Sequence, residues 1–222
     1  MDREEKYGLL QKLVDEWENC ERCGLCETRN SVVFGEGDPD AKVLIVGEAP
    51  GEDEDLDGNP FVGRSGELVD KFLRSFNSTR DDVFLTNAVG CRPTKDGKNR
   101  PPSAKEVEAC KERLHRTIEI VDPLVILILG GTAAKALVKG VRSITSTAND
   151  PTIPRLTAIT KGQCIDVKRT AFATFHPSYL LRHAEEVEGS PMHRAFEAWG
   201  KAFAVADTYE EIYWGKETPD RG

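Results

Sequence analysis

Short apolar runs alternate with longer amphipathic stretches along most of this chain. Each apolar run ends in or near Gly, Asn or a polar turn, which is typical of a buried strand. These runs occupy residues 42–47, 83–87, 124–129 and 171–175. Apolar side chains at helical spacing predict helices over residues 4–18, 65–76, 103–120, 131–138 and 190–206.

Strands that alternate with helices imply a parallel sheet covered on both faces. We therefore expect an α/β protein, a three-layer α/β/α sandwich around a central four-stranded parallel sheet. Ser103 followed by Glu106 forms a capping box at the start of a helix. The tract 141–168, rich in Thr, Ser, Pro and Asp, predicts a long loop or an irregular hairpin. We assign residues 1–206 to one domain and residues 207–222 to a C-terminal tail.

The composition is that of a soluble globular protein, with 39% hydrophobic and 31% charged residues in 222. No run approaches the roughly 18 apolar residues that cross a membrane, and the acidic N-terminus is unlike a secretory signal. We therefore expect a cytoplasmic monomer with no membrane partner. The net charge of −8 argues against non-specific adhesion to nucleic acid. One local segment is basic, and it contains Arg92, Lys95, Lys98 and Arg100 against Asp96 alone.

Unusual motifs follow the predicted strands, at the sheet edge where ligands bind in such folds. Gly47, Pro50 and Gly51 allow a tight turn that brings backbone amides close to a ligand. Phe61 lies in an otherwise polar loop, where its ring could stack on a planar base. The alternative for this segment is a plain strand-to-helix turn with solvated acids and one anchoring Phe.

Two further strands end in residues with candidate chemistry. Asn87 carries a donor and an acceptor, so it can read the edge of a base. His176 could stabilise negative charge on a leaving group. Tyr179, Leu180 and Leu181 could wedge into a duplex beside an extruded nucleotide. The alternatives are an Asx-turn at the strand end, and a proline turn that opens a helix with core leucines.

The cysteine spacing predicts a metal or cluster site. A C-x2-C pair near the N-terminus and two distant thiols beside the basic segment can enclose one centre. Without export, cysteines are expected to stay reduced. These candidate ligands are Cys20, Cys23, Cys91 and Cys110. Structural zinc and ordinary buried thiols remain the alternatives. Cys26 is a substitute ligand, and Cys164 is interpreted as a free thiol.

Together these motifs resemble the family 4 uracil-DNA glycosylases, the iron–sulfur branch of that superfamily. They occur in the family's order over roughly residues 15–206, and several independent motifs agree. The matching segments are CERCGLCETRN, VVFGEGDPDAKVLIVGEAPGEDED, GNPFVGRSGELVDKFL, VFLTNAVGCRP, PPSAKEVEAC, LVILILGGTAAKAL and FHPSYLLR.

The resemblance implies a DNA repair enzyme that hydrolyses the N-glycosidic bond of uracil, releases the base and leaves an abasic site. It implies one structural [4Fe–4S] cluster, with ligands Cys20, Cys23, Cys91 and Cys110. Uracil would be bound by Gly47, Glu48, Ala49, Phe61, Asn87 and His176. DNA would be contacted by Arg64, Arg92, Pro177, Ser178, Tyr179, Leu180 and Arg182. Such an enzyme is expected near the nucleoid.

Catalysis would depend on Glu48, Glu54 and His176. The best-known members of the superfamily place an Asp at the position of Ala49, whereas this chain and family 4 do not. Glu48 is therefore expected to line the pocket, and Glu54 to act as a catalytic or orienting acid. His176 and backbone amides of the 47–51 turn would stabilise the uracil anion.

The chain also departs from its relatives. The tract 141–168 is longer than in the family, and the Arg-Gly that commonly follows the third helix is missing. A branch that traps uracil covalently uses a His after the second strand and a Gln at the position of Ala49, and residues 88–102 contain no His. Turnover is therefore favoured over trapping. The rival hypothesis is a catalytically silent DNA-binding or replication-associated module, with a sliding clamp or another replication protein as partner.

Overall fold

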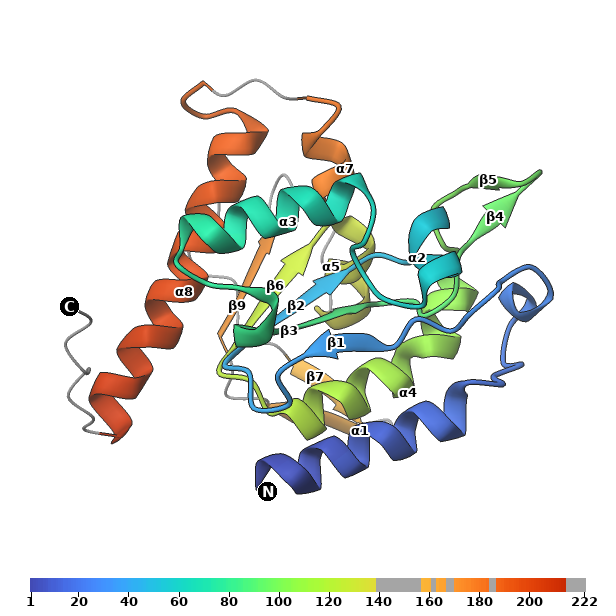
Figure 1. The fold of residues 1–222 in the computed structure, drawn as a ribbon, viewed down its shortest axis with the longest axis horizontal. Coiled ribbons are helices and arrows are strands. Elements are labelled where there is room, and N and C mark those ends of the chain that lie inside the picture. The colour runs from blue at the N-terminus through green and yellow to red at the C-terminus, as the bar shows by residue number, and fades with distance from the viewer. Residues whose placement is uncertain (139–156, 161–162, 167–169, 184–186, 215–222) are drawn as a thin grey trace.

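The computed structural model describes residues 1–138, 157–160, 163–166, 170–183 and 187–214 (Figure 1). Within these ranges, no helix combines the length and the hydropathy that a bilayer crossing requires.

A five-stranded sheet forms the centre of the fold, in the order β1-β3-β2-β6-β9. Four neighbouring strands are parallel, as predicted, and β1 adds an antiparallel edge. Strand β1 was not predicted, because its Gly-Glu-Gly has no apolar pattern. The strands are β1 (Gly35–Gly37), β2 (Val43–Gly47), β3 (Val83–Asn87), β6 (Val125–Leu129) and β9 (Thr170–Thr174).

Helices cover both faces of the sheet, which confirms the three layers. Figure 1 shows α3 and α8 on one side, and α4 with α1 outside it on the other. The helices are α1 (Arg3–Trp17), α2 (Glu52–Asp57), α3 (Arg64–Ser75), α4 (Ala104–Val121), α5 (Gly131–Leu137), α7 (Pro177–Leu180) and α8 (Pro191–Trp214), with 3₁₀ turns η1 (Gly24–Glu27) and η2 (Arg80–Asp82). Ser103 and Glu106 form the predicted capping box of α4.

Two hairpins lie outside the central sheet. One, β4 (Thr94–Lys95) with β5 (Lys98–Asn99), projects from the molecule at the right of Figure 1. The other, β7 (Thr157–Thr160) with β8 (Gln163–Asp166), lies in the tract predicted as a loop or irregular hairpin. The remainder of that tract lies outside the described residues. Helix α8 continues past residue 206, where the sequence analysis placed the start of the tail.

The central strands are apolar because both of their faces are buried. All residues of β2, β3 and β6 are buried, and Leu44, Ile45 and Leu127 have no exposed surface. Each such side chain stabilises the fold by about 1.5–3 kcal/mol. The parallel register pairs Gly47 with Asn87, so the residues that follow β2, β3, β6 and β9 meet at one edge. The core thus supplies a rigid base for that edge.

Candidate active site

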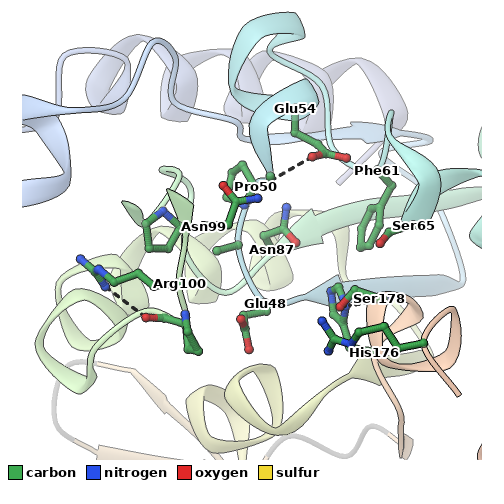
Figure 2. Close-up of a pocket in the computed structure, with 15 residues that line it drawn as sticks. Glu48, Pro50, Glu54, Phe61, Ser65, Asn87, Asn99, Arg100, His176 and Ser178 are labelled. Atoms are coloured by element: carbon green, nitrogen blue, oxygen red, sulfur yellow. Dashed lines mark hydrogen bonds between the residues drawn. The ribbon is translucent and has the colours of Figure 1, made fainter. Parts of the chain in front are cut away.

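A cavity of about 330 Å³ opens at the carboxyl ends of these strands (Figure 2). The sequence-predicted residues that line it are Glu48, Ala49, Glu54, Phe61, Asn87, His176, Ser178 and Arg182. Pro50 and Gly51, from the turn that the sequence analysis placed near a ligand, also line it. Lining residues that the sequence analysis did not assign to the site are Ser65, Pro93, Asn99, Arg100 and Pro101. Most of these lie inside the motifs, but spacing alone did not show which side chains face inward.

Gly47 lies beneath the cavity wall, where only a glycine fits. A Cβ atom there would lie 2.3 Å from Asn87 Oδ1 and 2.6 Å from Phe61 Cζ. The missing side chain therefore lets the amide of Asn87 and the ring of Phe61 close over the end of β2. This gives Gly47 its place at the site, although it does not itself line the cavity.

Asn87 is the last residue of β3 and only 3% exposed. Its backbone carbonyl accepts a hydrogen bond from Arg113, a fully buried residue of α4. In the described part of the chain, its side-chain amide forms no hydrogen bond, and Figure 2 shows this amide at the cavity. Asn87 therefore has a fixed backbone with a free donor and a free acceptor.

His176 caps the N-terminus of α7, and this cap determines its tautomer. Its Nδ1 accepts the backbone N–H of Ser178 at 3.2 Å and lies 2.9 Å from Ser178 Oγ. The proton of the neutral ring is therefore on Nε2. Burial and, to a smaller extent, the charge of Arg182 lower the pKa of His176 to about 4. Near pH 7 the ring is neutral and has one N–H left to donate.

Glu48 is half-buried at the cavity floor, directly after β2. Its Oε2 accepts a hydrogen bond from Thr132 Oγ1 at 2.5 Å, which orients the carboxylate. Within the described residues, no hydrogen bond occupies Oε1. Glu48 thus resembles Asn87 in having, within the described residues, a polar side-chain atom that no hydrogen bond occupies, and it differs in that its side chain is itself oriented.

Glu54 and Asp55 on α2 differ from Glu48, because both oxygens of each carboxylate accept hydrogen bonds. Glu54 accepts the backbone N–H groups of Gly51 at 2.9 Å and Gly63 at 3.0 Å, one on each oxygen. Asp55 is fully buried and accepts hydrogen bonds from the backbone and side chain of Asn30. Both carboxylates connect separate segments of backbone. The sequence analysis recognised this acidic run but not its bracing role.

The basic segment forms the other rim of the cavity. Arg100 makes two hydrogen bonds to Glu106, of 2.6 and 2.8 Å, and this partner lowers the pKa of Glu106 to about 2. Arg92 is buried and donates to Asn99 Oδ1 at 2.6 Å, so it does not face outward. Lys95 and Lys98, on the β4–β5 hairpin, are exposed and form no ion pair with any described residue. Arg64 is exposed but does not line the cavity.

Helix α7 corresponds to the proline turn considered as an alternative for its motif. Leu180 is fully buried in the core, and Pro177 is buried at the first helical position. Tyr179 stacks between Phe175 and His183, at centroid distances of 5.3 and 4.0 Å. The residues of this segment that face the cavity are therefore Ser178 and Arg182.

Three of the four predicted cysteine ligands share one buried cluster, and Cys20 packs against a separate one. Cys91 and Cys110 are buried against Leu25 and Val89, with Cys23 packed at the edge of this group. Burial above all, together with charge on Cys110, Cys23 and Cys20, raises the pKa of Cys91 to about 12 against the opposing effect of Arg29. The four predicted ligands are therefore close enough to influence one another electrostatically.

Arg29 and Cys26 lie near the predicted cysteine ligands. Arg29 Nη1 lies 3.8 Å from Cys91 Sγ and 2.6 Å from the carbonyl oxygen of Cys20, so it connects two of the cysteines. Cys26 is half-buried in η1. Among the described residues, no three His, Cys, Asp or Glu side chains are grouped as a single metal ion requires. The side chain of Cys164 lies outside the described part of the chain.

Comparison with known proteins identifies the family. Residues 34–200 match the Uracil DNA glycosylase superfamily. The chain belongs to this superfamily. The match includes every residue that lines the cavity, whereas Cys20 and Cys23 precede it.

Individual relatives agree with the superfamily match. A type-4 uracil-DNA glycosylase of Thermotoga maritima is 41% identical over 182 residues, which cover 82% of this chain and 86% of that protein. Proteins of the same name from Pyrobaculum aerophilum and Archaeoglobus fulgidus are 39% and 38% identical, over 78% of this chain and 85% and 83% of their own lengths. The similarity therefore covers more than four fifths of each of these relatives.

Proposed function

We propose that this protein is a uracil-DNA glycosylase, which hydrolyses the N-glycosidic bond of uracil in DNA, releases the base and leaves an abasic site. The superfamily match and the names of the relatives support this activity. Among the residues, Asn87 carries the proposal, because it is a buried amide at a strand end whose donor and acceptor are used by none of the described residues.

Base choice follows from the order of donor and acceptor on Asn87. Uracil presents an N–H at position 3 and a carbonyl at position 4, which match the oxygen and the nitrogen of an oriented amide. Cytosine presents the reverse pattern, so it would leave buried polar groups unpaired, at about 1–3 kcal/mol for each group. Phe61 would stack on the face of the base.

Bond cleavage leaves negative charge on uracil and positive charge on the sugar. The Nε2–H of His176 would donate to the uracil oxygen on which charge accumulates, and a neutral ring can do so without losing its proton. Glu48, with an unbound oxygen at the cavity, would stabilise the sugar cation and orient the water that attacks C1′. That water donates its hydroxyl to C1′, and its proton ends on the departing base.

Glu54 is assigned a different role. Since both of its oxygens accept backbone N–H groups, it would hold the Gly51 turn and the Gly63 turn at a fixed separation. It is therefore a positioning residue, and Glu48 is the better candidate for the acid near the reacting carbon.

DNA would approach across the open side of the cavity. Arg182 and Ser178 lie at one rim, and the hairpin with Lys95 and Lys98 extends from the other. Exposed, unpaired cations bind phosphate without reading sequence. Arg64 is exposed and fits the same role, whereas Arg92 would act by fixing the base of the hairpin. Uracil-containing DNA is thus the proposed partner. A protein that acts on this substrate is expected near the nucleoid.

The four cysteines fit an iron–sulfur cluster. Their donor set is all thiolate, and the buried Cys91 would ionise only beside strong positive charge, which iron provides. The ligands would be Cys20, Cys23, Cys91 and Cys110. When bound, the cluster would cross-link the N-terminal segment to β3 and α4, and it takes no part in hydrolysis.

The activity is tested with a single-stranded oligonucleotide that contains one uracil, incubated with the purified protein and then treated with alkali to cleave abasic sites. We expect one cleavage product at the uracil, free uracil in the supernatant, and no cleavage when cytosine or thymine replaces it. A protein with its visible cluster absorbance intact that yields no cleavage on any of these strands would be a silent DNA-binding module instead.

A further inference from the structure

Phe61 has an unusual backbone conformation for an aromatic residue. Its φ is +56°, in the left-handed region, and its side chain is only 4% exposed. A bulky side chain is strained there, because its Cβ approaches the following carbonyl. Such strain persists only where surrounding contacts enforce it, and it is concentrated at functional sites. The contacts that hold Phe61 in this conformation therefore also determine where its ring lies in the cavity.

The Phe61 carbonyl is held from two sides. Arg80 donates from Nη2 to this oxygen at 2.5 Å and from Nη1 to the carbonyl of Pro60 at 3.2 Å. On the other side is Gly66, where a Cβ atom would lie only 1.5 Å from the same oxygen. The turn of Pro60 and Phe61 is thus fixed by a guanidinium and by a position open only to glycine.

Arg80 is itself immobilised by two carboxylates. Its Nε donates to Asp70 Oδ1 of α3 at 2.7 Å, and its Nη1 pairs with Glu36 of β1. Hydrogen bonds and charge from these two acids raise the pKa of Arg80 against the opposing effect of burial. Two carbonyls and two carboxylates require the planar donor array of a guanidinium, which a lysine ammonium cannot supply.

We propose that Arg80 is a positioning residue for uracil recognition, which acts by holding Phe61 in its strained conformation. Arg80 is not among the described residues that line the cavity, so it would act only through the turn. The turn places Phe61 Cζ 2.6 Å from the point where a Cβ on Gly47 would lie, next to Asn87 Oδ1. The ring and the reading amide are thereby held at a fixed separation. This inference rests on the stacking role proposed for Phe61.

A double-mutant cycle tests it. The proteins are wild type, Phe61→Ala, Arg80→Met and the double variant, with Arg74→Met as a control that removes an exposed cation from the neighbouring α3. Two quantities are measured for each: kcat/KM for uracil excision, and affinity for an oligonucleotide that already carries an abasic site. We expect Arg80→Met to lower kcat/KM about tenfold, Arg80→Lys to restore little of it, and abasic-site affinity to stay within about twofold of wild type.

In the double variant, excision should equal that of Phe61→Ala alone, since Arg80 has no ring left to position. An additional tenfold loss in the double variant, or a parallel loss of abasic-site affinity, would show that Arg80 only maintains the fold and would overturn the proposal. If Arg80→Met keeps wild-type kcat/KM while Phe61→Ala is impaired, the positioning role of Arg80 would be overturned and the stacking role of Phe61 would stand. Wild-type excision by Phe61→Ala would remove the stacking role and this inference together, while the glycosylase activity itself would stand.

Discussion

Two groups of polar side chains, one at the cavity and one on the adjoining helix α2, have opposite hydrogen-bonding environments. The side chains of Glu48 and His176 are each oriented by one neighbour, and Asn87 has its backbone carbonyl bound by Arg113. Among the described residues, none uses the remaining polar atom of each side chain at the cavity. Glu54 and Asp55 on α2 have their oxygens occupied by backbone N–H groups. We call the first group the open residues and the second the braced residues. Burial and charge do not separate the two groups, whereas unused hydrogen-bonding capacity does.

The open residues should affect excision far more than folding. His176→Ala removes the Nε2–H proposed to stabilise the uracil anion, and loss of one such donor typically slows a reaction about 10²–10³-fold. Single-turnover excision of uracil measures this, with His193→Ala as a control because His193 is exposed on α8. A loss below about fivefold would move His176 into the braced group.

The braced residues should show the reverse. Asp55→Asn replaces an acceptor of backbone N–H groups by an amide that cannot satisfy them all, so unfolding should become easier by about 3 kcal/mol. Urea denaturation gives this value, and Asp57→Asn is the matched control, since Asp57 is exposed and its carboxylate accepts a hydrogen bond from the exposed Asn59. The excision rate for each folded molecule should be unchanged. A fall in that rate at unchanged stability would contradict the division.

The titration of His176 gives a smaller effect. Its pKa is about 4 in the folded protein against a usual 6.5, so the unfolded chain binds the proton more readily. This residue therefore contributes full stability above pH 6.5, and that contribution is lost as pH falls toward 4. At pH 5 the loss is about 2 kcal/mol, and it should be absent in His176→Ala. Urea midpoints of both proteins at pH 7 and pH 5 measure the difference, and equal shifts would show that His176 titrates normally.

The smallest effect concerns DNA contact at the rim. Replacing Lys95 and Lys98 together by Ala should remove two phosphate contacts and reduce the salt dependence of single-strand binding by roughly 1.4 in log–log slope. Lys12→Ala with Lys201→Ala is the control, since both lysines are exposed and neither lies near the cavity. An unchanged slope in the hairpin variant would exclude the hairpin from the DNA path.

Much of the fold could be predicted from the sequence because the strands are fully buried. Their short apolar runs and the helical spacing between them located β2, β3, β6 and β9 to within a residue or two. The structure also confirmed that motifs after different strands meet at one edge. β1 and α2 escaped prediction for physical reasons. Strand β1 has three residues, two of them glycines, so it has no periodic pattern. Helix α2 is a run of acidic residues, which is typical of a solvated loop when its hydrogen bonds are not known.

The division between open and braced residues could not be predicted. Glu48, Glu54 and Asp55 are the same chemical type within one motif, and only the hydrogen-bond partners in the structure distinguish them. Leu180 shows the same limit, since its motif suggested DNA contact and the structure buries it in the core. Arg80 lies in none of the motifs that the sequence analysis considered. Its proposed role comes from a hydrogen bond to the Phe61 carbonyl, in a turn 19 residues earlier in the sequence.

The account is tested most directly by the excision rate of Asn87→Ala, corrected for the folded fraction and compared with Asn19→Ala, a variant of an exposed asparagine on the surface. Asn87→Ala should leave the urea midpoint nearly unchanged and produce no alkali-labile sites under conditions where the wild type and Asn19→Ala cleave every uracil strand. An excision rate within a few-fold of wild type would show that the base is read elsewhere.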